Sequence, residues 1–330
     1  MAERILVTGG AGYIGSVVVA QLLDRGYQPI VFDDLSHGHR GALRLGTALI
    51  VGDIGDRAAL DRVFTEYQPQ AVMHFAAFIE AGESMRHPEI FFRNNTANAL
   101  MLLEAMIAHN VKRFVFSSTA ALYGTPEKTP IQEDAPLHPT NAYGESKLLV
   151  ERMLDWLHRI HGLRYACLRY FNAAGAAGEQ GEDHHPESHL IPLALQVALG
   201  VRKDIAIFGT DYPTPDGTCV RDYVHVTDLA SAHLLVLEAL KEKDQLIFNL
   251  GNGRGFSVRE VIETVRKVTG HPIPATESPR RPGDPAVLVA SSEKIKQELG
   301  WKPQFADLQS IVRSAWEWRR ARPDGYAEKK

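Results

Sequence analysis

The sequence predicts an α/β protein built on a doubly wound parallel sheet. Short β-branched segments alternate with longer amphipathic segments, which is typical of parallel strands connected by helices. A glycine-rich turn directly follows the first expected strand, where a nucleotide-binding sheet needs one. The chain has 330 residues, so we expect one large domain or two fused domains.

The first half of the chain is expected to contain two mononucleotide-binding halves. The expected strands cover residues 4–8, 28–33, 47–52, 71–75, 113–118 and 165–170. Amphipathic helices are expected between them, over residues 14–25, 57–67, 96–109 and 143–161. These elements predict a dinucleotide-binding domain of the Rossmann type over residues 1–171.

The sequence pattern changes after residue 171. Residues 172–192 are rich in Gly, Ala, His and acidic residues, which predicts a long functional loop. Helices are expected from Thr227-Asp228, from Ser257 with Glu260 completing a capping box, and over residues 307–322, after the proline-rich segment 272–285. We expect residues 172–224 and 251–330 to form a smaller C-terminal α/β substrate domain, and residues 225–250 to return to the first domain.

The composition disfavours several classes of partner. The net charge is −4, and 23% of the residues are charged, so the chain lacks the basic surface that nucleic acid or an anionic membrane requires. No apolar run approaches the roughly 20 residues of a membrane span, and the first residues do not resemble a signal peptide. Two cysteines, Cys167 and Cys219, suit a reducing compartment. We therefore expect a cytoplasmic protein.

The glycine-rich turn carries the features of a dinucleotide site. Gly9 allows a tight turn, Gly12 lets the backbone approach a pyrophosphate, and Gly15 permits close packing of the following helix on the sheet. The N-terminus of that helix offers amide donors and a positive dipole to the phosphates. Asp33, 18 residues after Gly15, ends the second strand, where its carboxylate can bind ribose hydroxyls and would repel a 2′-phosphate. The predicted cofactor is therefore NAD rather than NADP.

Tyr143 and Lys147 form a candidate catalytic pair. Their spacing places both side chains on one face of a helix, one turn apart. A nearby ammonium and a positively charged nicotinamide would lower the pKa of the phenol, so that a tyrosinate can accept a hydroxyl proton. Thr119 follows Ser117 at the end of an expected strand, and its hydroxyl can bridge Tyr143 and a substrate oxygen. Ligands bind at this end of parallel strands.

The glycine spacing and the catalytic pair resemble the extended short-chain dehydrogenase/reductase superfamily. Across essentially the whole chain, the ordered set of motifs resembles the UDP-glucose 4-epimerase family. The motifs that carry this resemblance are residues 7–15 (VTGGAGYIG), 74–77 (HFAA), 116–124 (FSSTAALYG), 143–147 (YGESK), 169–175 (RYFNAAG), 216–229 (DGTCVRDYVHVTDL) and 281–284 (RPGD).

The resemblance implies an enzyme that interconverts UDP-glucose and UDP-galactose. Tyr143 would take the 4-hydroxyl proton while the C4 hydride passes to NAD⁺, and the 4-keto sugar would turn and receive the same hydride on its other face. The two helices over 96–109 and 143–161 form a dimer interface in this family. Rows such as Leu100, Leu103 and Trp156 on those helices also fit plain packing on the sheet, and we adopt a homodimer as the hypothesis.

The resemblance also implies the residues of the site. Those assigned to the cofactor are Gly9, Gly12, Tyr13, Ile14, Gly15, Asp33, Asp53, Ile54, Phe75, Ala76, Ala77, Asn95, Ser117, Tyr143, Lys147 and Tyr170. Those assigned to the UDP-hexose are Thr119, Tyr143, Asn172, His189, Leu190, Ala206, Phe208, Arg221, Arg281, Asp284 and Leu288. Among them, the two arginines would pair with the diphosphate, as a guanidinium fork suits phosphate oxygens.

Two positions depart from the family pattern. Many members carry a cofactor-contacting lysine where this chain has Ile79, followed by Glu80, which bears on cofactor affinity. Leu288 stands where a bulky tyrosine excludes 2-acetamido sugars and a small residue admits them. Because leucine is intermediate in volume, UDP-N-acetylglucosamine and UDP-pentose 4-epimerase activities stay open as alternatives.

The sequence disfavours three alternative functions: a dehydratase, a non-catalytic regulator and a metalloenzyme. A nucleotide-sugar 4,6-dehydratase needs an acid and a base after Thr119, where this chain has Ala120-Ala121-Leu122. A non-catalytic NAD-binding regulator would have lost one of the catalytic residues, and all three are present. His184, His185 and His189 suggest a metal site, but Pro186 interrupts them and no helix-borne glutamate lies between, so we expect solvated loop histidines and no metal.

Overall fold

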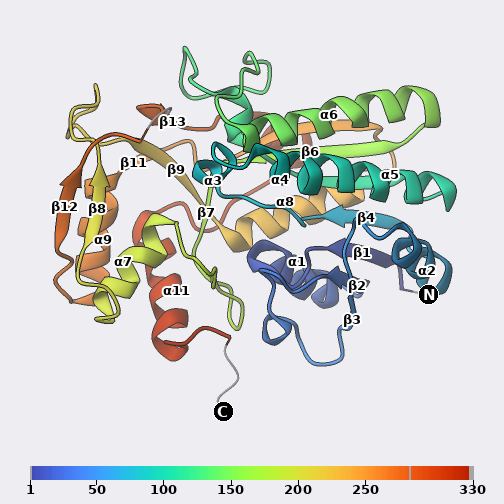
Figure 1. Cartoon of the computed structure of the whole chain (residues 1–330), viewed down its shortest axis with the longest axis horizontal. Helices are drawn as coiled ribbons and strands as arrows, with labels where there is room; N and C mark the ends of the chain where they lie inside the picture. Colours follow the sequence, from blue (N-terminus) through green and yellow to red (C-terminus); the bar gives the residue numbers. More distant parts are fainter. Residues whose placement is uncertain (1, 282–283, 327–330) are drawn as a thin grey trace.

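The computed structural model describes residues 2–281 and 284–326, and its centre is a seven-stranded sheet (Figure 1). All neighbouring strands of this sheet run parallel. The strands are β1 (Arg4–Thr8), β2 (Gln28–Asp33), β3 (Ala48–Val51), β4 (Ala71–His74), β5 (Arg113–Thr119), β6 (Arg164–Tyr170) and β10 (Gln245–Leu250). Their order is β10-β6-β5-β4-β1-β2-β3, so the predicted doubly wound parallel sheet is confirmed.

The strand order reverses between β1 and β4, which lie side by side. In a doubly wound sheet this reversal leaves a crevice beyond the carboxyl ends of the two strands, because their connections leave in opposite directions. The turn after β1 and the segment after β4 therefore form the floor of any ligand site.

Helices cover both faces of the sheet (Figure 1). One face carries α1 (Tyr13–Asp24) and α8 (Val226–Ala239), and the other carries α2 (Arg57–Tyr67), α5 (Asn98–Ala108) and α6 (Ala142–His161). Side chains of β1 alternate between the two cores: Ile5 and Val7 pack with α1, while Leu6 packs with α2. Strands buried on both faces read as continuous apolar runs, as the sequence of β1 does.

Shorter elements complete this half of the molecule. Two helical turns, α3 (Ala81–Ser84) and α4 (Pro88–Phe91), follow β4 and lead into α5 through a π-helical segment, Phe92–Ala97. The helix α10 (Glu293–Leu299) contacts β10. No helix within residues 2–281 and 284–326 has the length and apolar content to cross a membrane.

A second, smaller unit contains three packed helices and short strands, shown on the left of Figure 1. Its helices are α7 (Leu190–Ala198), α9 (Val258–Thr269) and α11 (Leu308–Ala321). They share one core that includes Ile191, Val261 and Ile311. The strands β9 (Val220–His225), β7 (Asn172–Ala174), β11 (Gly255–Ser257) and β13 (Val287–Leu288) form one sheet, and β8 (Ile205–Phe208) pairs with β12 (Ala275–Ser278).

The predicted elements of the first half agree with the structure to within two residues at each end. The capping box at Ser257 and Glu260 is confirmed. The expected loop over residues 172–192 is partly wrong, because β7 begins it and α7 starts within it at Leu190. Likewise, the segment 272–285 contains β12. The division into two domains stays a prediction.

Candidate active site

A cavity opens at the carboxyl ends of the large sheet, where the strand order predicts one. It brings together the glycine turn after β1, Asp33 at the end of β2, Ser117 and Thr119 at the end of β5, and the pair on α6. Among the residues predicted for the cofactor and substrate, those that line the cavity are Gly9, Gly12, Tyr13, Ile14, Gly15, Asp33, Asp53, Ile54, Phe75, Ala76, Ala77, Ser117, Thr119, Tyr143, Lys147, Tyr170, Asn172 and His189.

The glycines fit the roles predicted for them. Gly9 has φ +71°, and a Cβ there would collide with the backbone of Ala76. A Cβ at Gly15 would collide with the carbonyl of Gly9, so the first helical turn closes tightly on the loop. Gly12 is different, because the nearest described atom to its Cβ position is the Gly9 oxygen at 3.3 Å. The space in front of Gly12 therefore lies open to a ligand such as a pyrophosphate.

Asp33 is buried and partly used by the protein itself. One carboxylate oxygen accepts the backbone N–H of Ala11 at 2.9 Å, and the other accepts the N–H of Leu35 at 2.9 Å. Burial raises the pKa of Asp33, although these two hydrogen bonds counteract the rise. Each oxygen has a further lone pair, and Asp33 lines the cavity, so the carboxylate fits the ribose hydroxyls of NAD.

The helix α6 positions the catalytic pair. Asn141 caps its N-terminus by accepting the Gly144 N–H at 2.8 Å, and the backbone N–H of Tyr143 donates to Ser84 Oγ at 3.1 Å. One turn beyond Lys147, the buried carboxylate of Glu151 accepts the Ser118 hydroxyl at 2.6 Å. These bonds fix the helix against α3 and the end of β5.

Lys147 is 2% exposed, and its ammonium donates to the Ser117 carbonyl at 3.0 Å. It also lies 4.9 Å from the centre of the Phe116 ring. Burial lowers the pKa of Lys147 to about 7, because the charged form loses its hydration. The side chain is thus held in place, but its charge is only partly present at neutral pH.

The environment of Tyr143 differs from the sequence-based expectation. Burial raises the pKa of its phenol, a hydrogen bond with Thr119 lowers it, and the charge of Glu80 raises it further. Lys147, which was expected to lower this pKa, is not among the groups that shift it. Forming the tyrosinate therefore requires positive charge beyond what these side chains supply.

The position of the family's lysine is occupied by an apolar and an acidic residue. Ile79 and Glu80 both line the cavity, and the Ile79 N–H donates to the Glu80 carboxylate at 3.1 Å. The lysine contact is therefore replaced by negative charge near Tyr143.

Asn95 does not line the cavity, contrary to the prediction. It is 1% exposed, accepts the Phe78 N–H at 2.9 Å and donates to the Phe78 carbonyl at 2.9 Å. Its side-chain amide thus fixes the backbone of Phe78, which lines the cavity. The neighbouring Asn94 lines the cavity instead of Asn95.

The residues predicted for the uridine and diphosphate form a separate group, here called the uridine-side cluster: Ala206, Phe208, Arg221, Arg281, Asp284 and Leu288. Arg221 Nη2 donates to the Asp284 carboxylate at 2.6 Å. Arg281 lies over the Phe208 ring at 4.2 Å from its centre. Four of these residues lie on β8, β9 and β13, while Arg281 and Asp284 lie between β12 and β13, and none of the six lines the cavity. Leu190, the first residue of α7, packs on the smaller core.

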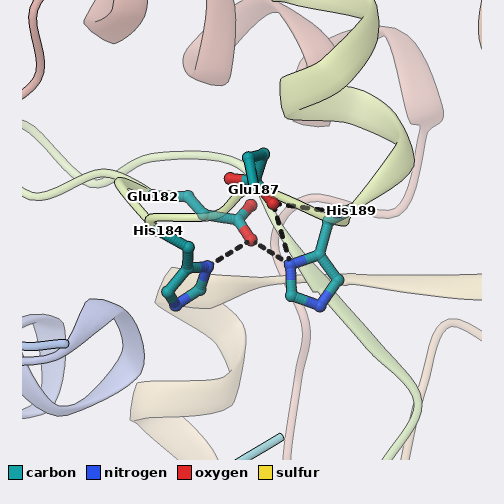
Figure 2. Close-up of side chains that lie close together, drawn as sticks. All are labelled: Glu182, His184, Glu187 and His189. Atoms are coloured by element: carbon teal, nitrogen blue, oxygen red, sulfur yellow. Dashed lines mark hydrogen bonds and ion pairs between the residues drawn. The ribbon is translucent and has the colours of Figure 1, made fainter. Parts of the chain in front are cut away.

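The expectation of solvated loop histidines is wrong for His184 and His189. Figure 2 shows both rings directed at the carboxylate of Glu182. Their Nδ1 atoms lie 3.2 Å and 2.6 Å from Glu182 Oε1, and both residues line the cavity. Burial alone would raise the pKa of Glu182, but the two imidazoles outweigh it and lower that pKa. His185, with 70% of its side chain exposed, is the solvated histidine.

Several cavity residues were not predicted from the sequence. They include Phe32, Asp34, Ser36, His37, Gly38, Phe78, Asn94, Phe171, Ala173, Glu182 and His184. Seven of them, Asp34, Ser36, His37, Gly38, Phe78, Phe171 and Ala173, lie within five residues after the end of β2, β4 or β6, so their position relative to these strands was a usable signal. Nothing comparable marked Glu182 and His184, which reach the cavity from the segment between β7 and α7.

Comparison with known proteins assigns this fold and site to a class. The model of the "NAD dependent epimerase/dehydratase family" matches residues 5–251. Since this match covers most of the chain, the protein belongs to that family, whose cofactor is the predicted NAD.

The match is also close within the family. The UDP-glucose 4-epimerase of Halalkalibacterium halodurans is 56% identical over 326 residues, 98% of this chain and 97% of that protein. A crystal structure of a UDP-glucose 4-epimerase, 50% identical, has a TM-score of 0.96 over 99% of this chain and 100% of that one. The Bifidobacterium longum enzyme in complex with NAD⁺ and UDP is 40% identical, with a TM-score of 0.94 over 98% and 99% of the two chains. The resemblance to the UDP-glucose 4-epimerases is confirmed.

Proposed function

We propose that this protein interconverts UDP-glucose and UDP-galactose by NAD-dependent epimerisation at C4. The observation that carries the proposal is the assembly of Tyr143, Lys147 and Thr119 on the same cavity as the glycine turn and Asp33. A dinucleotide held by the turn and by Asp33 would place its nicotinamide end toward α6, since Asp33 takes the adenosine ribose.

The chemistry needs one base and one hydride acceptor. Bound NAD⁺ supplies the hydride acceptor and the positive charge that favours the tyrosinate. Tyr143 accepts the proton of the 4-hydroxyl while the C4–H bond breaks, and Thr119 holds the same oxygen by a hydrogen bond. The 4-keto sugar would then turn its other face toward the cofactor position, where the hydride could return to C4 while Tyr143 gives the proton back to the 4-oxygen. No net oxidation follows, so one cofactor serves many turnovers.

Lys147 acts as a positioning residue for Tyr143 and the cofactor ribose. Its bond to the Ser117 carbonyl fixes the ammonium beside β5, where it can also face a ribose hydroxyl. Because the pKa of Lys147 is about 7, a charged ligand in the cavity can shift the protonation of its amine at neutral pH. We infer that substrate and cofactor set this protonation state.

The uridine-side cluster is the proposed site for the UDP group. Arg221 is paired with Asp284, and Arg281 is placed over an aromatic ring, so both guanidinium groups are oriented before a ligand arrives. Each guanidinium group can donate two parallel hydrogen bonds to phosphate oxygens, and the negatively charged diphosphate offers such oxygens to both arginines. Asn172 and Leu190 remain proposed contacts to the diphosphate or uracil, and His189 remains a proposed contact to the UDP-hexose.

Sugar selectivity depends on Leu288 in this proposal. The residue is half-buried on β13, next to Arg221 in register. A 2-acetamido group would meet a leucine rather than a small residue, which costs about 1–3 kcal/mol in discrimination. Slow turnover of UDP-N-acetylglucosamine is therefore compatible with the same site.

The exposed apolar faces of α5 and α6 support a homodimer. Trp156 and Ile160 on α6 are 63% and 69% exposed, and Leu100 on the neighbouring α5 is 36% exposed, whereas Leu103 is buried in the core. Sedimentation at micromolar protein should give a dimer for the wild-type chain and a monomer for Trp156→Glu. A wild-type monomer would remove this part of the proposal.

The two cysteines support a reducing, cytoplasmic location. Cys167 and Cys219 are both buried and unpaired with each other. Fractionation of cells of the source organism should recover the protein with cytoplasmic markers.

The direct test is conversion of UDP-galactose by the purified protein. The reaction is run with and without added NAD, and the UDP-hexoses are separated by chromatography. We expect UDP-glucose to form, and the requirement for added NAD measures how firmly the cofactor is retained despite Ile79 and Glu80. If neither sugar is converted even with NAD present, the proposed function is wrong.

A further inference from the structure

Four side chains of metal-ligating type converge beside the cavity (Figure 2). Glu182, His184, Glu187 and His189 each offer one ligand atom, and these atoms all lie within 4.8 Å of one another. The epimerisation proposed above does not use Glu182, His184 or Glu187. The proposed reaction therefore does not explain why these side chains lie together.

The distances within the cluster match a small coordination sphere. His184 Nδ1 and His189 Nδ1 lie 3.2 Å and 2.6 Å from Glu182 Oε1, and His189 Nδ1 lies 3.4 Å from Glu187 Oε1. Ligands placed 2.0–2.1 Å from a tetrahedral zinc ion are about 3.3 Å apart. The separations of 3.2 Å and 3.4 Å are close to the edge length of such a site, whereas the 2.6 Å separation would have to widen when a metal binds.

The alignment of the groups argues against a simple set of hydrogen bonds. The Nδ1 atoms of His184 and His189 are buried, yet neither has a hydrogen-bond partner with suitable geometry among the described residues. A ring nitrogen that lies close to a carboxylate oxygen without a hydrogen bond to it can share a cation with that oxygen. A buried ring nitrogen left unpaired costs free energy, which a shared cation would recover.

The cluster is also held by surrounding groups. Glu187 Oε1 accepts the backbone N–H groups of Ser188 and His189 at 2.7 Å and 2.8 Å. Next to Glu182, Asp183 is bound by Arg319 at 3.1 Å and by the backbone N–H of Tyr326 at 2.9 Å. Fixed outer contacts of this kind orient the ligands of metal sites.

We infer that Glu182, His184, Glu187 and His189 form a binding site for one divalent transition-metal ion of the zinc type. Metal binding requires both imidazoles to be deprotonated, and the two carboxylates then give the site a charge of −2, which a divalent cation neutralises. Two nitrogen ligands favour zinc and its neighbours over magnesium and calcium, which prefer oxygen ligands alone. The ion would fix the segment between β7 and α7 against the cavity wall.

The inference is tested by metal binding without any UDP-sugar, so its outcome is separate from that of the epimerase assay. The tag-free full chain, with its cofactor as purified, is treated with a chelator, dialysed and titrated with Zn²⁺ by calorimetry. We expect one tight equivalent per chain. A stoichiometry well below one would overturn the inference.

Three variants locate the site. Glu182→Gln and His184→Gln should each weaken zinc binding by at least about 100-fold, because even outer contacts of metal sites are typically worth 10–100-fold. His185→Gln is the matched control, since this neighbouring histidine is exposed and lies outside the cluster. Equal loss in His185→Gln, or unchanged binding in both cluster variants, would contradict the assignment.

A spectroscopic measurement on the wild-type chain tests the site without depending on the folding of the variants. Co²⁺ added to the wild-type chain should give the intense visible absorption of a four-coordinate ion, and Zn²⁺ should displace it stoichiometrically. Weak absorption typical of six-coordinate aqueous Co²⁺ would count against the site.

Discussion

The cavity and the uridine-side cluster are held together in different ways. At the cavity, the glycine turn, Asp33 and the pair on α6 are fixed by backbone contacts and by burial in the large sheet. In the uridine-side cluster, charged side chains on short strands are fixed chiefly by one another, as in the pair of Arg221 and Asp284. The first region is shaped by the backbone, and the second by side-chain pairing.

This difference has an energetic consequence for ligand binding. A site fixed by backbone contacts loses little conformational freedom when the cofactor binds, so most of the interaction energy is available for affinity. Arg221 must instead share or exchange its carboxylate partner for phosphate oxygens, so part of the substrate's binding energy is spent on rearrangement. We expect the cofactor to remain bound while substrates come and go.

The largest effect should come from removing the base while leaving the cavity intact. Tyr143→Phe deletes the phenolic oxygen, so kcat should fall about 10³-fold, within the range typical of general acid–base groups. NAD content, measured in the supernatant after denaturation, should be unchanged. Tyr67→Phe on α2 is the control. Activity near the wild-type level in Tyr143→Phe would show that another group accepts the proton.

Acid should destabilise the large-sheet region through its buried neutral histidines. Burial lowers the pKa of His233 to about 4, against 6.5 in the unfolded chain. Below pH 6.5 only the unfolded chain is protonated at this residue, so the free energy of unfolding falls until about pH 4. A shift of this size corresponds to about 3 kcal/mol.

Denaturant unfolding of the wild type and His233→Leu at several pH values measures this contribution. The variant should lose less stability between pH 6.5 and 4 than the wild type does, while the exposed control His138→Leu should follow the wild type. Identical pH slopes for His233→Leu and the wild type would contradict the assignment to this residue.

A backbone collision at the glycine turn should weaken the binding of NAD without changing the binding of the UDP group. Gly9→Ala forces a Cβ against the backbone at Ala76, and we expect a loss of about 1–3 kcal/mol, or about 5–150-fold, in NAD affinity. Gly26→Ala is a matched control, because Gly26 also has a positive φ of +79° but has open space around it. Equal losses in the two variants would mean that backbone strain, not the collision, matters.

The smallest effect concerns the uridine-side cluster. Arg221→Ala removes a charge-assisted contact to the diphosphate, so KM for UDP-galactose should rise about 10-fold, with kcat and NAD content little changed. Arg202→Ala, at an exposed position, should leave KM unchanged. If Arg221→Ala releases NAD, the two regions are not independent and the contrast drawn above fails.

The sequence predicted the large sheet well because its signals are local. The strands β1 to β6, the turn at Gly9 and the pair on α6 each follow from a short pattern with a known geometric meaning. NAD was predicted from Asp33 for the same reason.

The parts that were not predicted depend on contacts between distant segments. The raised pKa of Tyr143 reflects its own burial and the charge of Glu80, which no local pattern encodes. Asn95 was assigned to the cavity, but a turn of π-helix places it behind the wall. Glu182 joins His184 and His189 only because the segment after β7 folds back onto α1's end of the cavity, where Tyr13 meets His184.

The strand β10 has a consequence for how the molecule can be divided. It comes from residues 245–250, after much of the smaller unit, yet it pairs with β6 along its whole length. A fragment ending at residue 171 would therefore leave β6 as an open edge with unpaired amides, which invites aggregation. The nucleotide-binding half therefore cannot be exchanged between proteins as one continuous gene segment. A chimera would need three crossover points, one after residue 171 and one on each side of the segment that holds α8 and β10.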